Sequence, residues 1–205
     1  MKCPRMGLRT IRLTLATCLW LAGCSGAGPS DSAGQLSIRS RSDLRTALKS
    51  GFGAGIYSYD DRNNVTVVLF DGPQENPAQA VTIRLFWKPR AGRTPIDATA
   101  TNATIHYIIF TGTETKLAGV YSGAGFVYPK NTPGDATFTA SVWDANLLLG
   151  DSTWGFQDLL GQAQLKGGFT AQRNDAKVQE SIRRLNILVR ERLGYPRFVQ
   201  AGEEK

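Results

Sequence analysis

The chain has 205 residues, with 24 Lys or Arg against 17 Asp or Glu and a single His, and its formal net charge is +7 at pH 7. This length suits one domain with a hydrophobic core of its own. One histidine cannot by itself form the catalytic zinc sites that use several protein ligands. It is also the only histidine that a serine-based nucleophilic site could use as its base. The composition therefore counts against metal hydrolases and most triad enzymes.

The N-terminus has the layout of an export signal. A basic segment from Lys2 to Arg12 contains no acidic residue, and the apolar run Leu13–Leu21 follows it. This run is far shorter than the roughly 20 apolar residues that a membrane-spanning helix needs. It leads directly into Leu21-Ala22-Gly23-Cys24.

These four residues resemble the lipobox of bacterial lipoproteins, a resemblance that covers only the first 24 residues. It implies that residues 1–23 are a signal peptide, that a diacylglyceryl group is attached to the thiol of Cys24, and that the chain is cleaved before this residue. Two or three acyl chains would anchor the protein stably in a membrane. Ser25, in place of the aspartate that often retains lipoproteins in the inner membrane, favours the outer membrane facing the periplasm. The alternative is an ordinary secretory signal in which Cys24 has no special role.

Cleavage before Cys24 changes what charge and cysteine content imply. Four basic residues leave with the signal, so the mature chain has 20 basic and 17 acidic residues, a net charge of +3. This small excess is poor support for nucleic-acid binding, and no nucleic-acid partner is expected. Cys3 and Cys18 also leave, so no disulfide is possible within the mature domain.

Residues 24–35 are expected to form a flexible tether, because Ser25–Gly34 is small and polar throughout. A short helix is expected next, capped by Ser42 and ended by Gly51, since Leu44, Ala47 and Leu48 share one helical face.

A series of β segments follows. The expected strands are Ile56–Tyr59, Val65–Phe70, Val81–Trp87, Ile105–Phe110, Leu117–Tyr121, Phe126–Tyr128, Thr137–Val142 and Ala163–Ala171. Glycine runs at 51–55 and 123–125 are interpreted as turns or bulges, because no helix N-terminus follows them to bind a phosphate.

The clearest helix is predicted at the C-terminal end. Asn174 or Asp175 caps it, Gly194 ends it and Pro196 prevents its continuation. Its apolar stripe consists of Val178, Ile182, Leu185, Leu188, Val189 and Leu193. The sequence thus predicts one domain over residues 36–198, with a frayed tail at 199–205. The expected fold is mainly β, a β-sandwich of immunoglobulin-like architecture with a short N-terminal and a longer C-terminal helix.

No constellation of catalytic residues is found, and neither a cofactor nor a metal is expected. His106 lies within an apolar strand, and no spacing supports Ser122, Ser141 or Asp144 as its partners. The oxygen-rich loop Asp60–Asn64 offers calcium ligands, but Asp and Asn are also the preferred residues of a hairpin loop.

Two surfaces are candidate contact sites. Trp87 with Lys88, Arg90 and Arg93 forms a basic stretch suited to a ligand or partner, with a solvated loop as the alternative. A second group of aromatic residues, expected either as a sugar-stacking platform or as core, consists of Tyr121, Tyr128, Trp143 and Trp154. The leading expectation is a non-catalytic, lipid-anchored envelope protein that binds another envelope protein as an assembly accessory factor. A glycan- or small-ligand-binding module that uses residues around Trp87 or Trp143 is the alternative.

Overall fold

A computed structural model describes residues 32–60, 64–85, 101–111 and 116–195, and it confirms a mainly β fold. Within these ranges the chain forms nine strands and one helix. In chain order they are β1 (Gly34–Ser40), β2 (Ala47–Phe52), β3 (Ala54–Tyr59), β4 (Val65–Asp71), β5 (Gln79–Leu85), β6 (Ala103–Thr111), β7 (Leu117–Pro129), β8 (Thr137–Ser152), β9 (Ala163–Arg173) and α1 (Asp175–Leu193).

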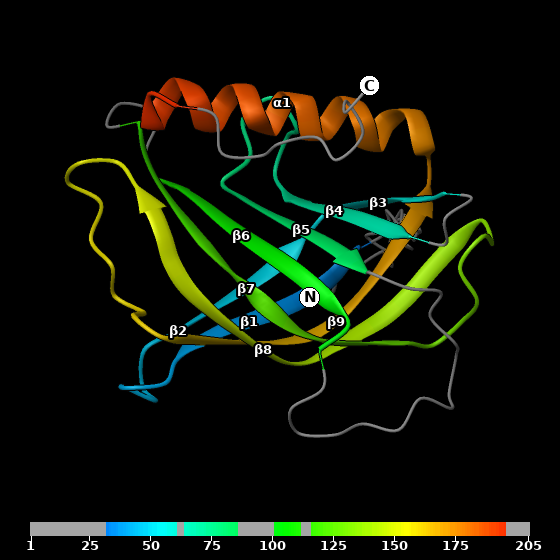
Figure 1. Ribbon diagram of the computed structural model, residues 1–205, viewed down its shortest axis with the longest axis horizontal. Coiled ribbons are helices and arrows are strands. Elements are labelled where there is room, and N and C mark those ends of the chain that lie inside the picture. The colour runs from blue at the N-terminus through cyan, green and yellow to red at the C-terminus, as the bar shows by residue number, and fades with distance from the viewer. Residues whose placement is uncertain (1–31, 61–63, 86–100, 112–115, 196–205) are drawn as a thin grey trace, which may run out of the picture.

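The strands belong to one strongly bent sheet that β9 closes (Figure 1). Each strand from β3 to β8 pairs antiparallel with the next strand in the chain, and β8 pairs with β9 from Thr137↔Gln172 onwards. On its other edge, β9 pairs first with β1, beginning at Ser40↔Ala163, and then in parallel with β3 at Ile56↔Gln172. Because all strands share one hydrogen-bonded sheet, the expected two-sheet, immunoglobulin-like sandwich is not confirmed.

Alternation along the strands separates a filled interior from an outer face. On β5, Val81, Ile83 and Leu85 are buried in the interior, whereas Thr82 and Arg84 lie on the outer face. The largest fully buried side chains include Tyr57, Tyr107, Tyr121, Phe52, Phe70 and Phe138. β4 is buried at nearly every position, as the sequence predicts for a strand covered on both faces.

The cover on the outer face is α1, which contacts β3, β4 and β7 (Figure 1). The side chain of Asn174 accepts a hydrogen bond from the backbone N–H of Lys177, and Gly194 ends the helix with a φ of 84°. Val178, Leu185 and Val189 are buried in a second core with residues of the sheet, including Ile56, Val68, Phe70, Ile108, Phe110 and Val120. The predicted helix, its caps and its stripe are therefore confirmed. Within the described ranges, no helix has the length and apolar content that crossing a membrane requires.

The predicted helix from Ser42 to Gly51 is wrong. Residues 47–52 form β2, which pairs with β1 from Gly34↔Phe52 to Arg39↔Ala47. Leu44, part of the supposed apolar face, is 68% exposed in the intervening turn, and alternate burial of Ser50 and Phe52 gives β2 the period of a strand. β1 begins at Gly34, two residues before the domain start expected from the sequence.

β7 passes through its glycine run without a turn, in contrast to the two separate strands expected there. A Cβ atom added at Gly123 would lie 1.9 Å from the carbonyl oxygen of Asn146, and one added at Gly125 would lie 2.4 Å from Cα of Ala145. The missing side chains therefore allow β8 to lie very close to β7 at these positions.

Asn102, just before β6, extends the pairing of β6 with β7 through its side chain. The backbone ladder of β6 with β7 ends at Ala103↔Gly125, two residues before Val127. The backbone N–H of Val127 donates to Oδ1 of Asn102 over 2.7 Å, and Nδ2 of Asn102 donates to the carbonyl of Val127 over 2.8 Å. Since Asn102 is only 3% exposed and Val127 is fully buried, this side chain satisfies two backbone groups that water does not reach.

Candidate functional site

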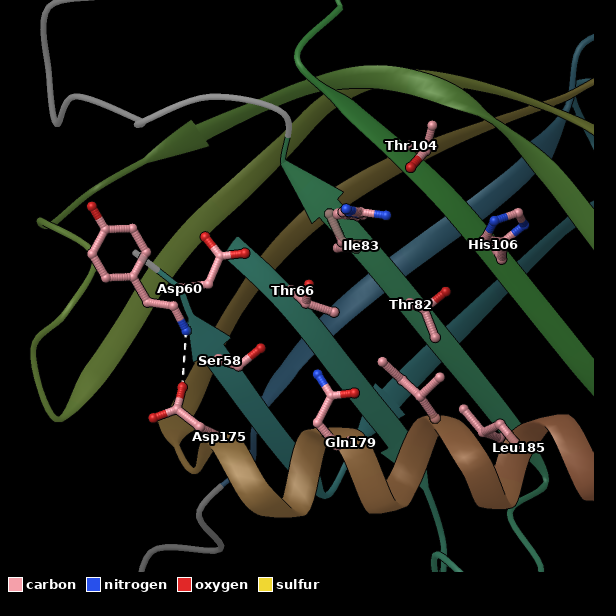
Figure 2. A pocket seen from close by; sticks show the side chains of 13 residues that line it. Ser58, Asp60, Thr66, Thr82, Ile83, Thr104, His106, Asp175, Gln179 and Leu185 are labelled. Atoms are coloured by element: carbon pink, nitrogen blue, oxygen red, sulfur yellow. Dashed lines mark hydrogen bonds between the residues drawn. The ribbon is translucent and has the colours of Figure 1, made fainter. Parts of the chain in front are cut away.

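A groove of about 400 Å³ lies on the outer face of the sheet, between the first turns of α1 and strands β3 to β6 (Figure 2). Its lining residues come from both walls: Ser58, Tyr59, Asp60, Thr66, Thr82, Ile83, Arg84, Thr104 and His106 from the sheet and its edge, and Asp175, Gln179, Ile182 and Leu185 from α1.

Strand register brings the polar residues of the sheet wall together. Ser58 pairs with Thr66 across β3 and β4, Thr66 pairs with Arg84 on β5, and Arg84 pairs with Thr104 on β6. Each occupies an outward position on its strand, so cross-strand neighbours form one polar row. Within the described part of the chain, none of the hydroxyls of Ser58, Thr66 and Thr104 is engaged by another side chain.

The helix wall is fixed at its first turn. The carboxylate of Asp175 accepts a hydrogen bond from the backbone N–H of Tyr59 at 3.0 Å, drawn as a dashed line in Figure 2. It also lies 3.5 Å from Nε of Arg173. Gln179 follows one turn later, and the partly buried Ile182 adds aliphatic surface further along the same face, above the buried Leu185. The groove thus combines a hydroxyl-rich wall with a partly apolar one.

The two ends of the groove differ in charge, with Asp60 and Asp175 at one end and His106 at the other (Figure 2). Nδ1 of His106 lies 2.9 Å from Oγ of Ser122, its cross-strand partner on β7. The other two residues considered as partners for His106 are elsewhere. Ser141 pairs with Tyr128 near the far end of β7, and the carboxylate of Asp144 accepts a hydrogen bond from Gln164.

The loop considered for calcium is only partly described, because residues 61–63 lie outside the described ranges. The carboxylate of Asp60 accepts hydrogen bonds from the backbone N–H of Asn64 at 2.8 Å and from its side-chain amide at 2.9 Å. These bonds close the β3–β4 connection, in agreement with a hairpin loop. No group of three or more His, Cys, Asp or Glu side chains suited to a metal is found among the described residues.

Most of the contact residues expected from the sequence lie outside the described residues, namely Cys24, Trp87, Lys88, Arg90 and Arg93. The proposed aromatic platform does not form, because Tyr121 is buried in the interior and donates to Asp158, whereas Trp143 and Trp154 are exposed.

The groove itself was not predicted. Its signal in the sequence is the row of threonines at alternate positions, Thr66, Thr82 and Thr104, beside the apolar positions of three strands. Alternation shows that such residues face outwards, but not that a helix lies beside them. Comparison of the chain with protein-family models, with curated proteins and with solved structures finds no match.

Proposed function

We propose that this protein is a lipid-anchored envelope protein whose domain binds a saccharide in the groove between α1 and β3–β6. The observation that carries the proposal is a polar row on the sheet that faces α1 across the groove. The row consists of Ser58, Thr66, Arg84 and Thr104, and the groove has a volume of about 400 Å³. A volume of this order falls within the roughly 300–1,000 Å³ typical of small-ligand sites.

The chemistry of the two walls favours a sugar over other small ligands. Hydroxyl groups donate and accept hydrogen bonds, and Arg84 and Gln179 add further donors, which matches the mixed donors and acceptors of a saccharide. Ile182, which is only partly buried, offers aliphatic surface for the C–H face of a sugar ring. In this proposal the ligand replaces water at hydroxyls that no side chain of the described residues engages.

The anchor rests on the resemblance of Leu21-Ala22-Gly23-Cys24 to a lipobox. Lipid on Cys24 would hold the domain at a membrane, with the outer membrane favoured if the cell has two, and within reach of cell-wall glycans. Mass spectrometry of the N-terminal peptide from membrane-extracted protein tests this: the expected mass is that of an acylated cysteine, and an unmodified Cys24 contradicts it.

Titration calorimetry with the N-acetylglucosamine–N-acetylmuramic acid disaccharide as probe tests the groove. Thr82→Val replaces a lining hydroxyl with a methyl group, and Thr139→Val makes the same change on β8, away from the groove. Loss of one hydrogen bond is worth about 1 kcal/mol, so the disaccharide should bind several-fold more weakly to Thr82→Val. Thr139→Val should bind like the unmodified chain. Absence of binding, or equal losses in both variants, counts against the proposal. Binding of another envelope protein stays a separate prediction from the sequence.

A further inference from the structure

The β1–β2 turn and the β8–β9 loop both lie at one end of the long axis of the molecule (Figure 1, left), and they carry three large, exposed apolar side chains. They are Leu44 in the turn and Trp154 and Leu159 in the loop, with 68%, 98% and 70% of their surfaces exposed. These are the three highest values among large hydrophobic residues in the described part of the chain. We call Leu44, Trp154 and Leu159 the apolar end.

Hydrogen bonding holds the turn and the loop side by side. Ser40 and Ala163 are paired at the end of the β1–β9 ladder, and the backbone N–H of Arg41 donates to the carbonyl of Gln162 over 2.7 Å. Leu44 and Leu159 therefore project from adjoining segments rather than from separate parts of the surface.

The loop is pinned to the domain, so the exposure of Trp154 and Leu159 does not result from a loose segment. Phe156 packs against the interior core, and a Cβ atom added to Gly119 would lie 2.3 Å from its ring. Leu160 is buried, and the carboxylate of Asp158 accepts hydrogen bonds from the hydroxyl of Tyr121 at 2.6 Å and from two backbone N–H groups of the loop. A loop with these inward contacts presents its remaining apolar side chains in fixed positions.

The charge beside the apolar end is mainly positive. The hairpin Gly34–Phe52 has four basic residues, Arg39, Arg41, Arg45 and Lys49, and one acid, Asp43. The carboxylate of Asp43 is already engaged by the hydroxyl of Thr46 and the backbone N–H of Arg45. Segments that enter the interface of a membrane with anionic lipids typically combine exposed Trp and Leu side chains with flanking Arg and Lys.

We propose that the apolar end inserts into the interface of an anionic bilayer and so fixes the orientation of the domain on its membrane. The proposal rests on the lipid anchor of the proposed function. The nine residues Ser25–Ala33 span about 30 Å when extended, whereas the seven residues of β1 span roughly 23 Å. The segment between Cys24 and β1 is therefore longer than β1 itself. A lipid on Cys24 can lie in the bilayer while the far end of β1, and with it the apolar end, contacts the same bilayer. The groove under α1 stays clear of the membrane.

The test uses the full-length, membrane-extracted protein in vesicles of phosphatidylglycerol and phosphatidylcholine with brominated acyl chains, which quench nearby tryptophans. Trp154→Phe removes the indole from the apolar end, and Trp143→Phe removes an indole that is also exposed, at 59%, but lies on β8. The expected result is that brominated lipid quenches part of the emission, that Trp154→Phe abolishes most of this quenching, and that Trp143→Phe preserves it.

Quenching that is equal in the two variants, or absent, overturns the proposal and points to a protein partner at the apolar end. The anchor is tested separately by the mass of the N-terminal peptide and by a Cys24→Ser chain. The mass of the N-terminal peptide shows whether Cys24 carries a lipid, independently of tryptophan quenching. An absent anchor and an apolar end that does not enter the membrane therefore give different results.

Discussion

Asn102→Ala tests whether one side chain completes the hydrogen bonding of β7 beyond the end of its ladder with β6. In the structure the Asn102 amide donates to the carbonyl of Val127 and accepts from its N–H, over 2.8 and 2.7 Å. Alanine removes both partners and leaves the two backbone groups of a fully buried residue without a hydrogen bond.

The expected cost follows from the number of groups left unsatisfied. A buried donor or acceptor without a partner costs about 1–3 kcal/mol, and two are created here. A water molecule entering the vacated space would satisfy one of them, so we expect a loss of about 2–4 kcal/mol in the free energy of unfolding. For a domain of this size the midpoint of thermal unfolding should fall by roughly 5–15 °C.

Urea unfolding followed by tryptophan fluorescence and circular dichroism measures this loss. Asn76→Ala is the matched control, because Asn76 is exposed in the connection between β4 and β5 and its only described hydrogen bond comes from its backbone N–H. Its substitution should change the unfolding free energy by no more than about 0.5 kcal/mol. Equal free energies of unfolding for the two variants would refute the role assigned to Asn102.

Three further predictions concern the close packing of β7 and β8, the ionisation of a buried tyrosine and the cap of α1. Gly123→Ala should destabilise the protein by about 1–3 kcal/mol, because the added Cβ atom meets the backbone of β8. Gly168→Ala is the control and should not destabilise it, because the nearest atom to its added Cβ lies 3.8 Å away. Similar urea midpoints for the two variants would contradict the close approach of β7 and β8. Burial raises the pKa of the Tyr107 phenol to about 12. The protonated phenol therefore contributes stability that is complete below pH ~10, the unfolded value, and is lost as the pH rises through the folded value. Unfolding measured across this window should show a steeper loss for the unmodified chain than for Tyr107→Phe, and parallel curves would argue against a buried phenol. Asn174→Ala should cost about 1 kcal/mol through loss of the helix cap; thermal unfolding by circular dichroism checks this, and an unchanged midpoint would show that the cap contributes nothing.

Local sequence patterns predicted those elements whose local conformational preference agrees with their packing in the fold. The stripe from Val178 to Leu193 and its flanking Asn174 and Gly194 define α1 without reference to the rest of the chain. At β2, by contrast, Leu44, Ala47 and Leu48 have helical spacing, and only pairing with β1 decides in favour of a strand. β1 itself carried a short signal, Leu36 and Ile38 alternating with polar residues, that the prediction did not use.

The groove could not be predicted from the sequence, for a different reason. Its polar residues face outwards on their strands, which alternation predicts, but the groove exists because α1 crosses the same face after β9. Pairing of β9 with β1, β3 and β8 joins segments from both ends of the domain, and no local pattern encodes it.

The position of β9 has a consequence for how the chain reaches this fold. β1, β3 and β8 all pair with β9, the last strand of the described residues, so none of the three is fully paired until β9 has been synthesised. Such non-local pairing slows folding and leaves strand edges open in the partly folded chain. A chain truncated before Ala163 should therefore aggregate rather than form a smaller domain.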